Sequence, residues 1–181
     1  MIDWHLAKQT LSIGDHPLVM GIVNVTPDSF SDGGQFGTTD EAVAHGLELV
    51  KQGADLLDIG GESTRPGATP VPLQEELLRV VPVVEALARQ TPAPISVDTY
   101  KADVARQCLE RGAQVINDVT ALTGDPDMPA VVRHFDAGVV LMHMQGNPTT
   151  MQENPHYEDV VKDLLKFFRG RIKACVKAGI S

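Results

Sequence analysis

Two stretches of this chain place metal-binding and phosphate-binding side chains directly after short apolar runs. The first stretch, residues 24–34, follows the apolar run 19–23, and the second, residues 60–67, contains Arg65 before a Pro-Gly pair. The amide oxygen of Asn24 can accept a hydrogen bond or coordinate Mg²⁺, which commonly arrives with substrate phosphates. A guanidinium on a restrained loop can bind two phosphate oxygens at once. Because ligands of α/β proteins bind at the carboxyl ends of strands, both stretches predict one shared site.

Three further runs end in side chains suited to a flat, polar ligand. Asp98 and Asn117 end two successive apolar runs, and Met142 and His143 end a third. A carboxylate and an amide at adjacent strand tips can recognise the donors and acceptors along the edge of a heterocycle. Methionine more often fills gaps in a core, and a lone histidine is more often structural. Asp98 and Asn117 are therefore the stronger candidates.

Several of these residues also have a purely structural interpretation. Asn24 lies three residues before a proline and is a common turn former. Arg65 could form an ordinary surface salt bridge. Asp98 could cap a helix that begins near Lys101. The residues alone leave both interpretations open.

The elements that must position these side chains alternate regularly along the chain. Strands are predicted near residues 19–24, 55–59, 94–98, 114–118 and 138–143, and helices near 39–52, 73–90, 101–111, 127–136 and 157–178. This alternation predicts a parallel α/β sheet in a single domain, residues 1–181. A small hairpin over residues 2–6 and 11–13 would close one end of the sheet. The second helix spaces its leucines and valines along one face, with Leu73, Leu77, Leu78, Val81, Val84 and Leu87 predicted to be buried.

Two architectures fit five strands with interleaved helices. One is a small doubly wound parallel sheet, and the other is about the first five β/α units of an eight-stranded TIM barrel. A doubly wound sheet concentrates its ligand groups at the point where strand order reverses. Nearly every strand here delivers a polar side chain at its carboxyl end, which favours the incomplete barrel.

The composition narrows the function classes. The formal net charge of -9, with no long basic run, argues against nucleic-acid binding and against anionic membranes. No apolar stretch approaches the roughly 20 residues of a membrane helix. Cys108 and Cys175 lie far apart without a Cys-x-x-Cys pattern, so a reduced, cytoplasmic protein is expected.

Five motifs resemble those of the dihydropteroate synthase family, in family order. They are Asn-Val-Thr-Pro-Asp-Ser-Phe-Ser-Asp-Gly-Gly at 24–34, Asp-Ile-Gly-Gly-Glu-Ser-Thr-Arg-Pro-Gly at 58–67, Ser-Val-Asp-Thr at 96–99, Ile-Asn-Asp at 116–118 and Leu-Met-His-Met-Gln-Gly-Asn-Pro at 141–148. The resemblance implies a folate-pathway TIM barrel that uses Mg²⁺. Such an enzyme joins 6-hydroxymethyl-7,8-dihydropterin diphosphate to para-aminobenzoate and releases pyrophosphate.

The resemblance also implies roles for particular residues. Asn24 would hold the metal and the diphosphate, and Asp98 and Asn117 would grip the pterin ring, with Met142 a further substrate-binding candidate. The remaining candidates would form the para-aminobenzoate pocket and the second loop, namely Phe30, Asp32, Ser63, Thr64, Arg65 and Pro66. Catalytic roles are expected for Asn24, Asp32 and Arg65. Sulfonamides would compete with para-aminobenzoate.

The similar enzymes continue with three motifs that these 181 residues do not contain: an Asp-Pro-Gly strand, a Ser-Arg-Lys loop and an Arg-Val-His near the end. We therefore expect a chain that lacks the C-terminal third of the barrel and is poorly stable or inactive alone. Family members are commonly homodimers through late helices. Two alternative functions stay open: another pterin-binding enzyme, such as a methyltetrahydrofolate methyltransferase, and an inactive truncated pterin-binding fragment.

Overall fold

The computed structural model describes residues 2–14, 16–26, 35–63, 69–148 and 150–181. Its main sheet has five strands, β3 (Met20–Asn24), β4 (Leu56–Gly60), β5 (Ile95–Asp98), β6 (Val115–Asp118) and β7 (Gly138–Leu141). All neighbouring pairs are parallel, and the order in space is the order in sequence. A doubly wound sheet would reverse its strand order at a switch point. The structure therefore supports the incomplete barrel and excludes the doubly wound alternative.

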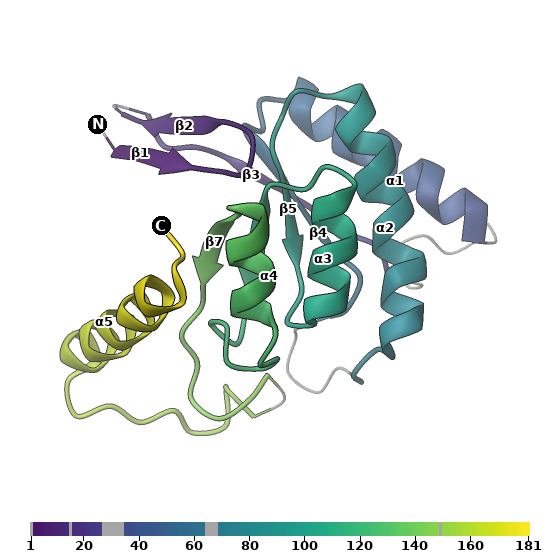
Figure 1. Ribbon diagram of the computed structural model, residues 1–181. Coiled ribbons are helices and arrows are strands. Elements are labelled where there is room, and N and C mark those ends of the chain that lie inside the picture. The colour runs from purple at the N-terminus through teal and green to yellow at the C-terminus, as the bar shows by residue number, and fades with distance from the viewer. Residues whose placement is uncertain (1, 15, 27–34, 64–68, 149) are drawn as a thin grey trace.

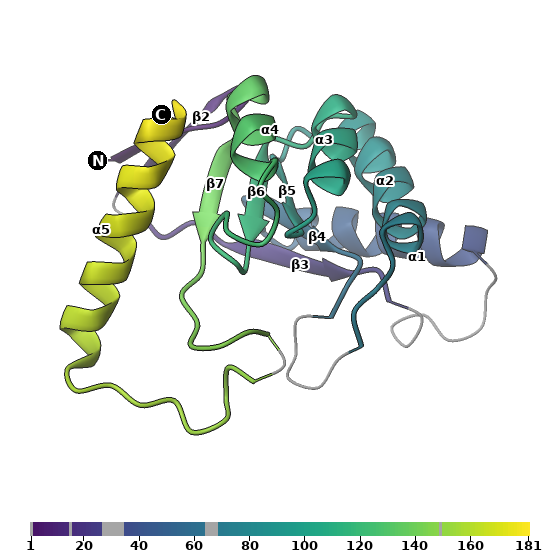
Figure 2. The same cartoon turned by 60° about the horizontal axis from the view of Figure 1, so that its bottom comes forward.

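The helices follow their strands as the alternation predicted. They are α1 (Gln35–Lys51), α2 (Leu73–Gln90), α3 (Ala102–Glu110), α4 (Met128–Phe135) and α5 (Val160–Ala178). The helices α1 to α4 line one face of the sheet (Figure 1), and α5 packs against α4 on the β7 side (Figure 2). The core between sheet and helices is aliphatic, with fully buried Val23, Leu57, Ile59, Val83, Leu87 and Val97.

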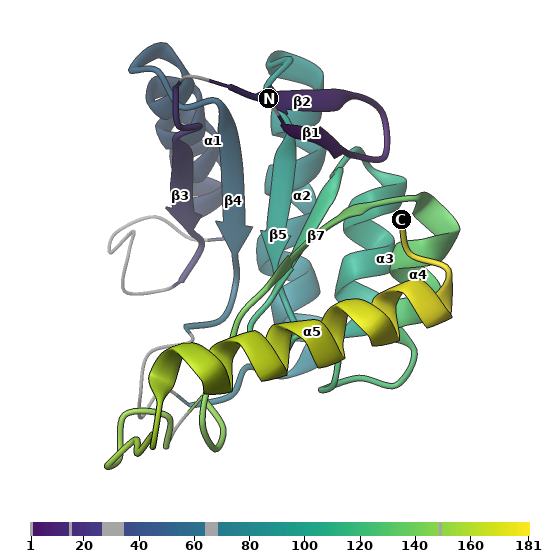
Figure 3. The same ribbon diagram turned by 90° about the vertical axis from the view of Figure 1, so that its left-hand side faces the viewer.

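The predicted hairpin is confirmed and closes the amino-terminal end of the sheet. Its strands are β1 (Ile2–His5) and β2 (Thr10–Ile13), paired antiparallel. Leu6, just after β1, is buried, and a Cβ at Gly138 would lie 2.6 Å from its Cδ2 atom. The start of β7 is therefore covered by the hairpin, and the opposite, carboxyl end of the sheet stays clear of it (Figure 3).

Some predicted boundaries and one predicted face were wrong. Helix α5 begins at Val160 rather than at 157, because the Asp159 side chain accepts a hydrogen bond from the Lys162 backbone N–H and so caps the helix. In α2, Leu78 is 62% exposed, whereas Glu76 is buried at 1%. The apolar spacing missed Glu76 because its partners lie outside the helix: the Thr99 hydroxyl donates to its carboxylate at 2.7 Å, and the Lys101 ammonium neutralises it.

The close contact between β4 and α2 gives a stability prediction at Gly61, the residue after β4. A Cβ built there would lie 2.5 Å from Cγ2 of the fully buried Val80. Overpacking of this kind typically costs about 1–3 kcal/mol, so we expect Gly61→Ala to lower the free energy of unfolding by that amount in urea titration. Gly170→Ala in α5 is the matched control, because no atom lies within 4 Å of its Cβ position. The control should gain about 0.5–1 kcal/mol, and equal loss in both variants would contradict the prediction.

Candidate functional site

Register places three predicted site residues in one row across the sheet. Asn24 pairs with Gly60, Gly60 with Asp98, and Asp98 with Asn117. Each of these residues ends its strand or lies next to the end. Because side chains alternate along a strand, residues in register project from the same face. Asn24, Asp98 and Asn117 are thus brought together at the carboxyl edge, as the sequence predicted.

Gly60 leaves space in the middle of this row. A Cβ built on Gly60 would lie 3.7 Å from Oδ2 of Asp98 and 3.8 Å from Oδ1 of Asn24. Any side chain at this position would therefore fill the space between the amide oxygen and the carboxylate. Glycine allows a ligand to approach the backbone closely at such a point. Across the sheet, the row thus presents the amide of Asn24, a gap at Gly60, the carboxylate of Asp98 and the amide of Asn117, in that order.

Asp98 is a poorly solvated carboxyl group with one oxygen unpartnered among the described residues. Its Oδ1 atom is buried and has no hydrogen-bond partner within the described part of the chain. Burial raises the pKa of Asp98 from 3.8 to about 7, and repulsion from Asp58, Glu76 and other acids adds to this shift. The predicted alternative, a cap for α3, is wrong, because Oδ2 of Asp125 accepts the hydrogen bond from the Ala102 N–H at 2.9 Å. A buried acceptor at a strand end is instead available to a ligand.

Asp58 is one of the polar strand-end residues of the sequence, but the sequence prediction gave it no role in the site. Its Oδ2 accepts a hydrogen bond from Nδ2 of Asn117 at 3.0 Å, which fixes the orientation of the amide. Its Oδ1 and the hydroxyl of Ser96 are both buried without a hydrogen-bond partner among the described residues. Burial raises the pKa of Asp58, although the neighbouring Ser96 and Asn117 side chains lower it. The one signal in the sequence was a charged residue inside the apolar run 56–59.

The contacts of Asp118 and His143 are those of structural residues. Asp118 Oδ1 accepts from the Thr120 N–H at 2.7 Å and Oδ2 accepts from the Leu122 N–H at 3.0 Å, so the carboxylate braces the turn after β6. The ring of His143 packs edge-on against Phe167, with centroids 4.7 Å apart. Met142, which directly follows β7, is half-buried.

The predicted para-aminobenzoate residues fall mostly outside the described part of the chain. Phe30 and Asp32 lie in the stretch 27–34, and Thr64, Arg65 and Pro66 lie in the stretch 64–68. Ser63 is described and is half-buried. The roles of these residues therefore stay predictions, as does the alternative of a surface salt bridge for Arg65.

The oxygen atoms of this row suit a metal ion that is coordinated mainly by substrate phosphates and water. Among the described residues, no group of three or more His, Cys, Asp or Glu side chains lies close enough to hold a metal ion. Asn24 is exposed at the edge strand β3, and its oxygen faces the space above Gly60. Mg²⁺ typically takes one or two protein oxygens and completes its shell with phosphates and water. The row therefore fits Mg²⁺ carried on a diphosphate.

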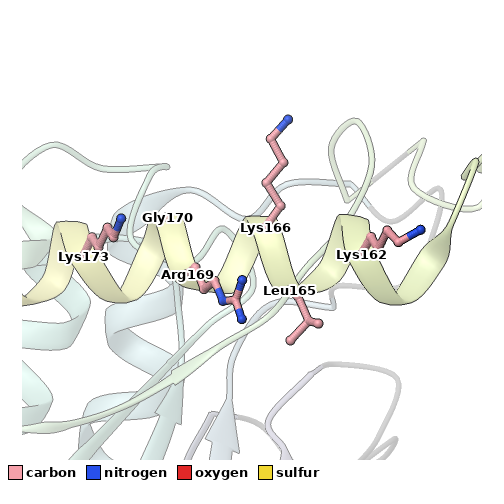
Figure 4. Close-up of a pocket in the computed structure, with 6 residues that line it drawn as sticks. All are labelled: Lys162, Leu165, Lys166, Arg169, Gly170 and Lys173. Atoms are coloured by element: carbon pink, nitrogen blue, oxygen red, sulfur yellow. The ribbon is translucent and has the colours of Figure 1, made fainter.

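A hollow on α5 is separate from this row. It is lined by Lys162, Leu165, Lys166, Arg169, Gly170 and Lys173, all from one helix (Figure 4). No residue from the ends of β3 to β6 lines it. Surface lysines without a buried polar group do not define a ligand site, so the strand row is the candidate functional site.

Within the described ranges, no helix combines the length and the apolar character needed to cross a membrane.

Comparison with known proteins gives a consistent result. Residues 20–181 match the family described as pterin binding enzyme. The chain is 49% identical over 166 residues to dihydropteroate synthase of Escherichia coli (strain K12), covering 92% of this chain and 58% of that protein. It is similar in structure to dihydropteroate synthase of Xanthomonas albilineans with 4-aminobenzoic acid, with a TM-score of 0.89, 54% identity, and coverage of 99% and 63%.

A second solved structure agrees, the Yersinia pestis dihydropteroate synthase with a sulfonamide drug complex. The TM-score is 0.90 at 48% identity, and the match covers 99% of this chain and 65% of that one. The chain thus spans about three-fifths of the length of the relatives it matches.

Proposed function

The chain belongs to the family of pterin-binding enzymes, and from this we propose that it carries the pterin-binding half of a dihydropteroate synthase site. The reaction joins 6-hydroxymethyl-7,8-dihydropterin diphosphate to para-aminobenzoate and releases pyrophosphate. The observation that carries the proposal is the register row of Asn24, Gly60, Asp98 and Asn117, with the unpartnered Oδ1 of Asp98. The identity to dihydropteroate synthases supports it.

In this proposal Asp98 and Asn117 bind the polar edge of the pterin ring. The Asp98 carboxylate accepts from ring N–H groups, and the Asn117 amide, held by Asp58, presents its oxygen to a further donor. Asn24, across the Gly60 gap from Asp98, is proposed to hold the diphosphate and Mg²⁺. When bound, Mg²⁺ would neutralise the charge of the leaving diphosphate. Met142, half-buried beyond β7, is proposed as a further contact to the ring.

The chemistry that follows needs no covalent enzyme intermediate. The bond between the pterin methylene carbon and the diphosphate oxygen breaks, and diphosphate leaves with the electron pair. The arylamine nitrogen of para-aminobenzoate then attacks the resonance-stabilised methylene cation and loses a proton. The protein contributes charge stabilisation, substrate orientation and exclusion of water. Asp32 and Arg65 as catalytic groups, and Phe30, Ser63, Thr64 and Pro66 in a para-aminobenzoate and sulfonamide pocket, are part of this proposal.

The test is release of pyrophosphate in the presence of 6-hydroxymethyl-7,8-dihydropterin diphosphate and Mg²⁺. Release that depends on para-aminobenzoate supports the proposal. Saturable pterin binding without release would support the pterin-binding half alone and favour the inactive fragment, whereas no saturable pterin binding would overturn the proposal. Turnover independent of para-aminobenzoate would favour another pterin enzyme. Family membership also leads us to propose a cytoplasmic location, which cell fractionation would check, and a homodimer for the full-length family, which sedimentation would check.

A further inference from the structure

A buried lysine joins the two described ends of the connection between β4 and α2. Lys101 lies at the N-terminal boundary of α3, directly after Tyr100. Its Nζ forms ion pairs with Glu62 Oε2 and Glu76 Oε2 and donates a hydrogen bond to the Val71 carbonyl oxygen at 2.8 Å. Glu62 lies two residues after β4, and Val71 lies two residues before α2. One ammonium group therefore holds the outgoing and the returning ends of this connection.

Neighbouring side chains complete the cluster. The Tyr100 hydroxyl donates to Glu62 Oε1 at 2.9 Å, and the Thr99 hydroxyl donates to Glu76 Oε1 at 2.7 Å. The side chains of Lys101, Glu62 and Glu76 are only 18%, 10% and 1% exposed. Burial alone would lower the pKa of Lys101, but the two carboxylates raise it above its usual value. The lysine is therefore a permanent cation in a tightly connected network.

Such a network is a poor source of stability. Desolvation of buried charges offsets most of their attraction, and apolar side chains of the same size often stabilise a fold as well or better. A buried ion cluster is better suited to fixing one geometry. Here the cluster fixes the position of Glu62. Its neighbour Ser63 also lies at the carboxyl edge of the sheet, which carries the candidate site.

We propose that Lys101 is a positioning residue that holds Glu62 and its neighbour Ser63, directly after β4, in place for the second substrate, para-aminobenzoate. Lys101 acts through Glu62 and Val71 and does not itself reach the register row. The positions of the pterin residues do not depend on it, because Asp98 and Asn117 are fixed by strand pairing and by the contact of Asn117 with Asp58. This inference rests on the proposed function, since the second substrate is assigned there.

The experiment compares Lys101→Met, Lys101→Arg and Lys51→Met with the parent protein. Lys51 is the matched control, because it is 79% exposed in a surface pair with Glu48. Calorimetry measures binding of 6-hydroxymethyl-7,8-dihydropterin, and then of para-aminobenzoate with pterin, pyrophosphate and Mg²⁺ present. We expect Lys101→Met to weaken para-aminobenzoate binding about tenfold or more, since misplacement by about 1 Å is sufficient for such losses. Pterin binding should weaken far less than para-aminobenzoate binding, Lys101→Arg should restore most of the affinity, and Lys51→Met should match the parent.

Two results would overturn the inference: unchanged para-aminobenzoate binding in Lys101→Met, or equal weakening of both ligands, which would mean a general loss of structure. Hydrogen exchange separates this inference from the proposed function, because it needs no ligand. Amides of residues 61–63, Thr69 and Val71 should exchange faster in Lys101→Met, while those of β3 and β6 should not. If the parent binds neither ligand, the proposed function fails, and the assignment to para-aminobenzoate fails with it. The exchange result still decides whether Lys101 holds Glu62 and Val71, the two ends of the connection between β4 and α2.

Discussion

Asp98→Asn should bind 6-hydroxymethyl-7,8-dihydropterin roughly 100-fold more weakly than the parent at pH 8, because a hydrogen bond to a charged group contributes about 1.5–3 kcal/mol. At this pH the Asp98 carboxyl, with a pKa of about 7, is ionised and can accept from ring N–H groups. The asparagine keeps the shape and one acceptor oxygen but places an N–H₂ donor where the carboxylate had its second oxygen. A donor facing ring donors leaves groups of both partners unsatisfied.

The matched control for this experiment is Asp103→Asn. It makes the same chemical change on α3 at a carboxylate that is 56% exposed and pairs with Arg106. Titration calorimetry should give the parent dissociation constant for this control. An Asp98→Asn variant that binds pterin as tightly as the parent would remove Asp98 from the site, and equal weakening in both variants would indicate a nonspecific charge effect.

The register row could be predicted from sequence because parallel strands bring their carboxyl ends to one edge. Asn24, Asp98 and Asn117 each follow an apolar run, and this local pattern was sufficient to place them together. The choice of the barrel over the doubly wound sheet rested on the same polar strand ends. The structure confirms it through the sequential strand order.

The remaining site features depend on contacts between distant parts of the chain. Asp58 meets Asn117 across 59 residues, and Lys101 meets Glu62 across 39. Neither partner of such a pair identifies the other from sequence, since each looks like an isolated charge in an apolar or loop segment. Glu76 shows the same limit, because apolar spacing assigned the buried face of α2 to residues such as Leu78. Glu76 enters the core because Lys101 neutralises it, and Lys101 comes from another element.

Asp98 also connects the site to the stability of the fold. Three carboxyl groups near the sheet edge, Asp58, Asp98 and Asp118, have pKa values raised mainly by burial. A carboxyl group with a raised pKa binds its proton more tightly in the folded than in the unfolded chain. Its ionisation therefore destabilises the fold, so a ligand-binding acid kept at this edge lowers stability at neutral pH.

Asp98→Asn should therefore be more stable than the parent at pH 8. Between about pH 4 and pH 7 the folded parent holds a proton on Asp98 that the unfolded chain has lost, so its free energy of unfolding falls as pH rises through this window. At about 1.4 kcal/mol per pKa unit, a shift from 3.8 to about 7 corresponds to roughly 4 kcal/mol, and we expect about 2–4 kcal/mol because water at the open edge weakens the effect. Asparagine does not titrate, so the variant should lose this part of the pH dependence and keep the smaller part due to Asp58 and Asp118.

Urea unfolding at pH 4.5, 6, 7 and 8 measures this pH dependence of the free energy of unfolding directly, with Asp103→Asn again as the control. The difference in stability between parent and Asp98→Asn should be smallest at pH 4.5 and should grow steadily up to about pH 7, the pKa of Asp98. A variant that is less stable than the parent at pH 8 would show that the ionised carboxylate has favourable partners in the folded protein. The same substitution is thus expected to weaken pterin binding and to strengthen the fold, a combination that distinguishes a ligand-binding acid from a structural one.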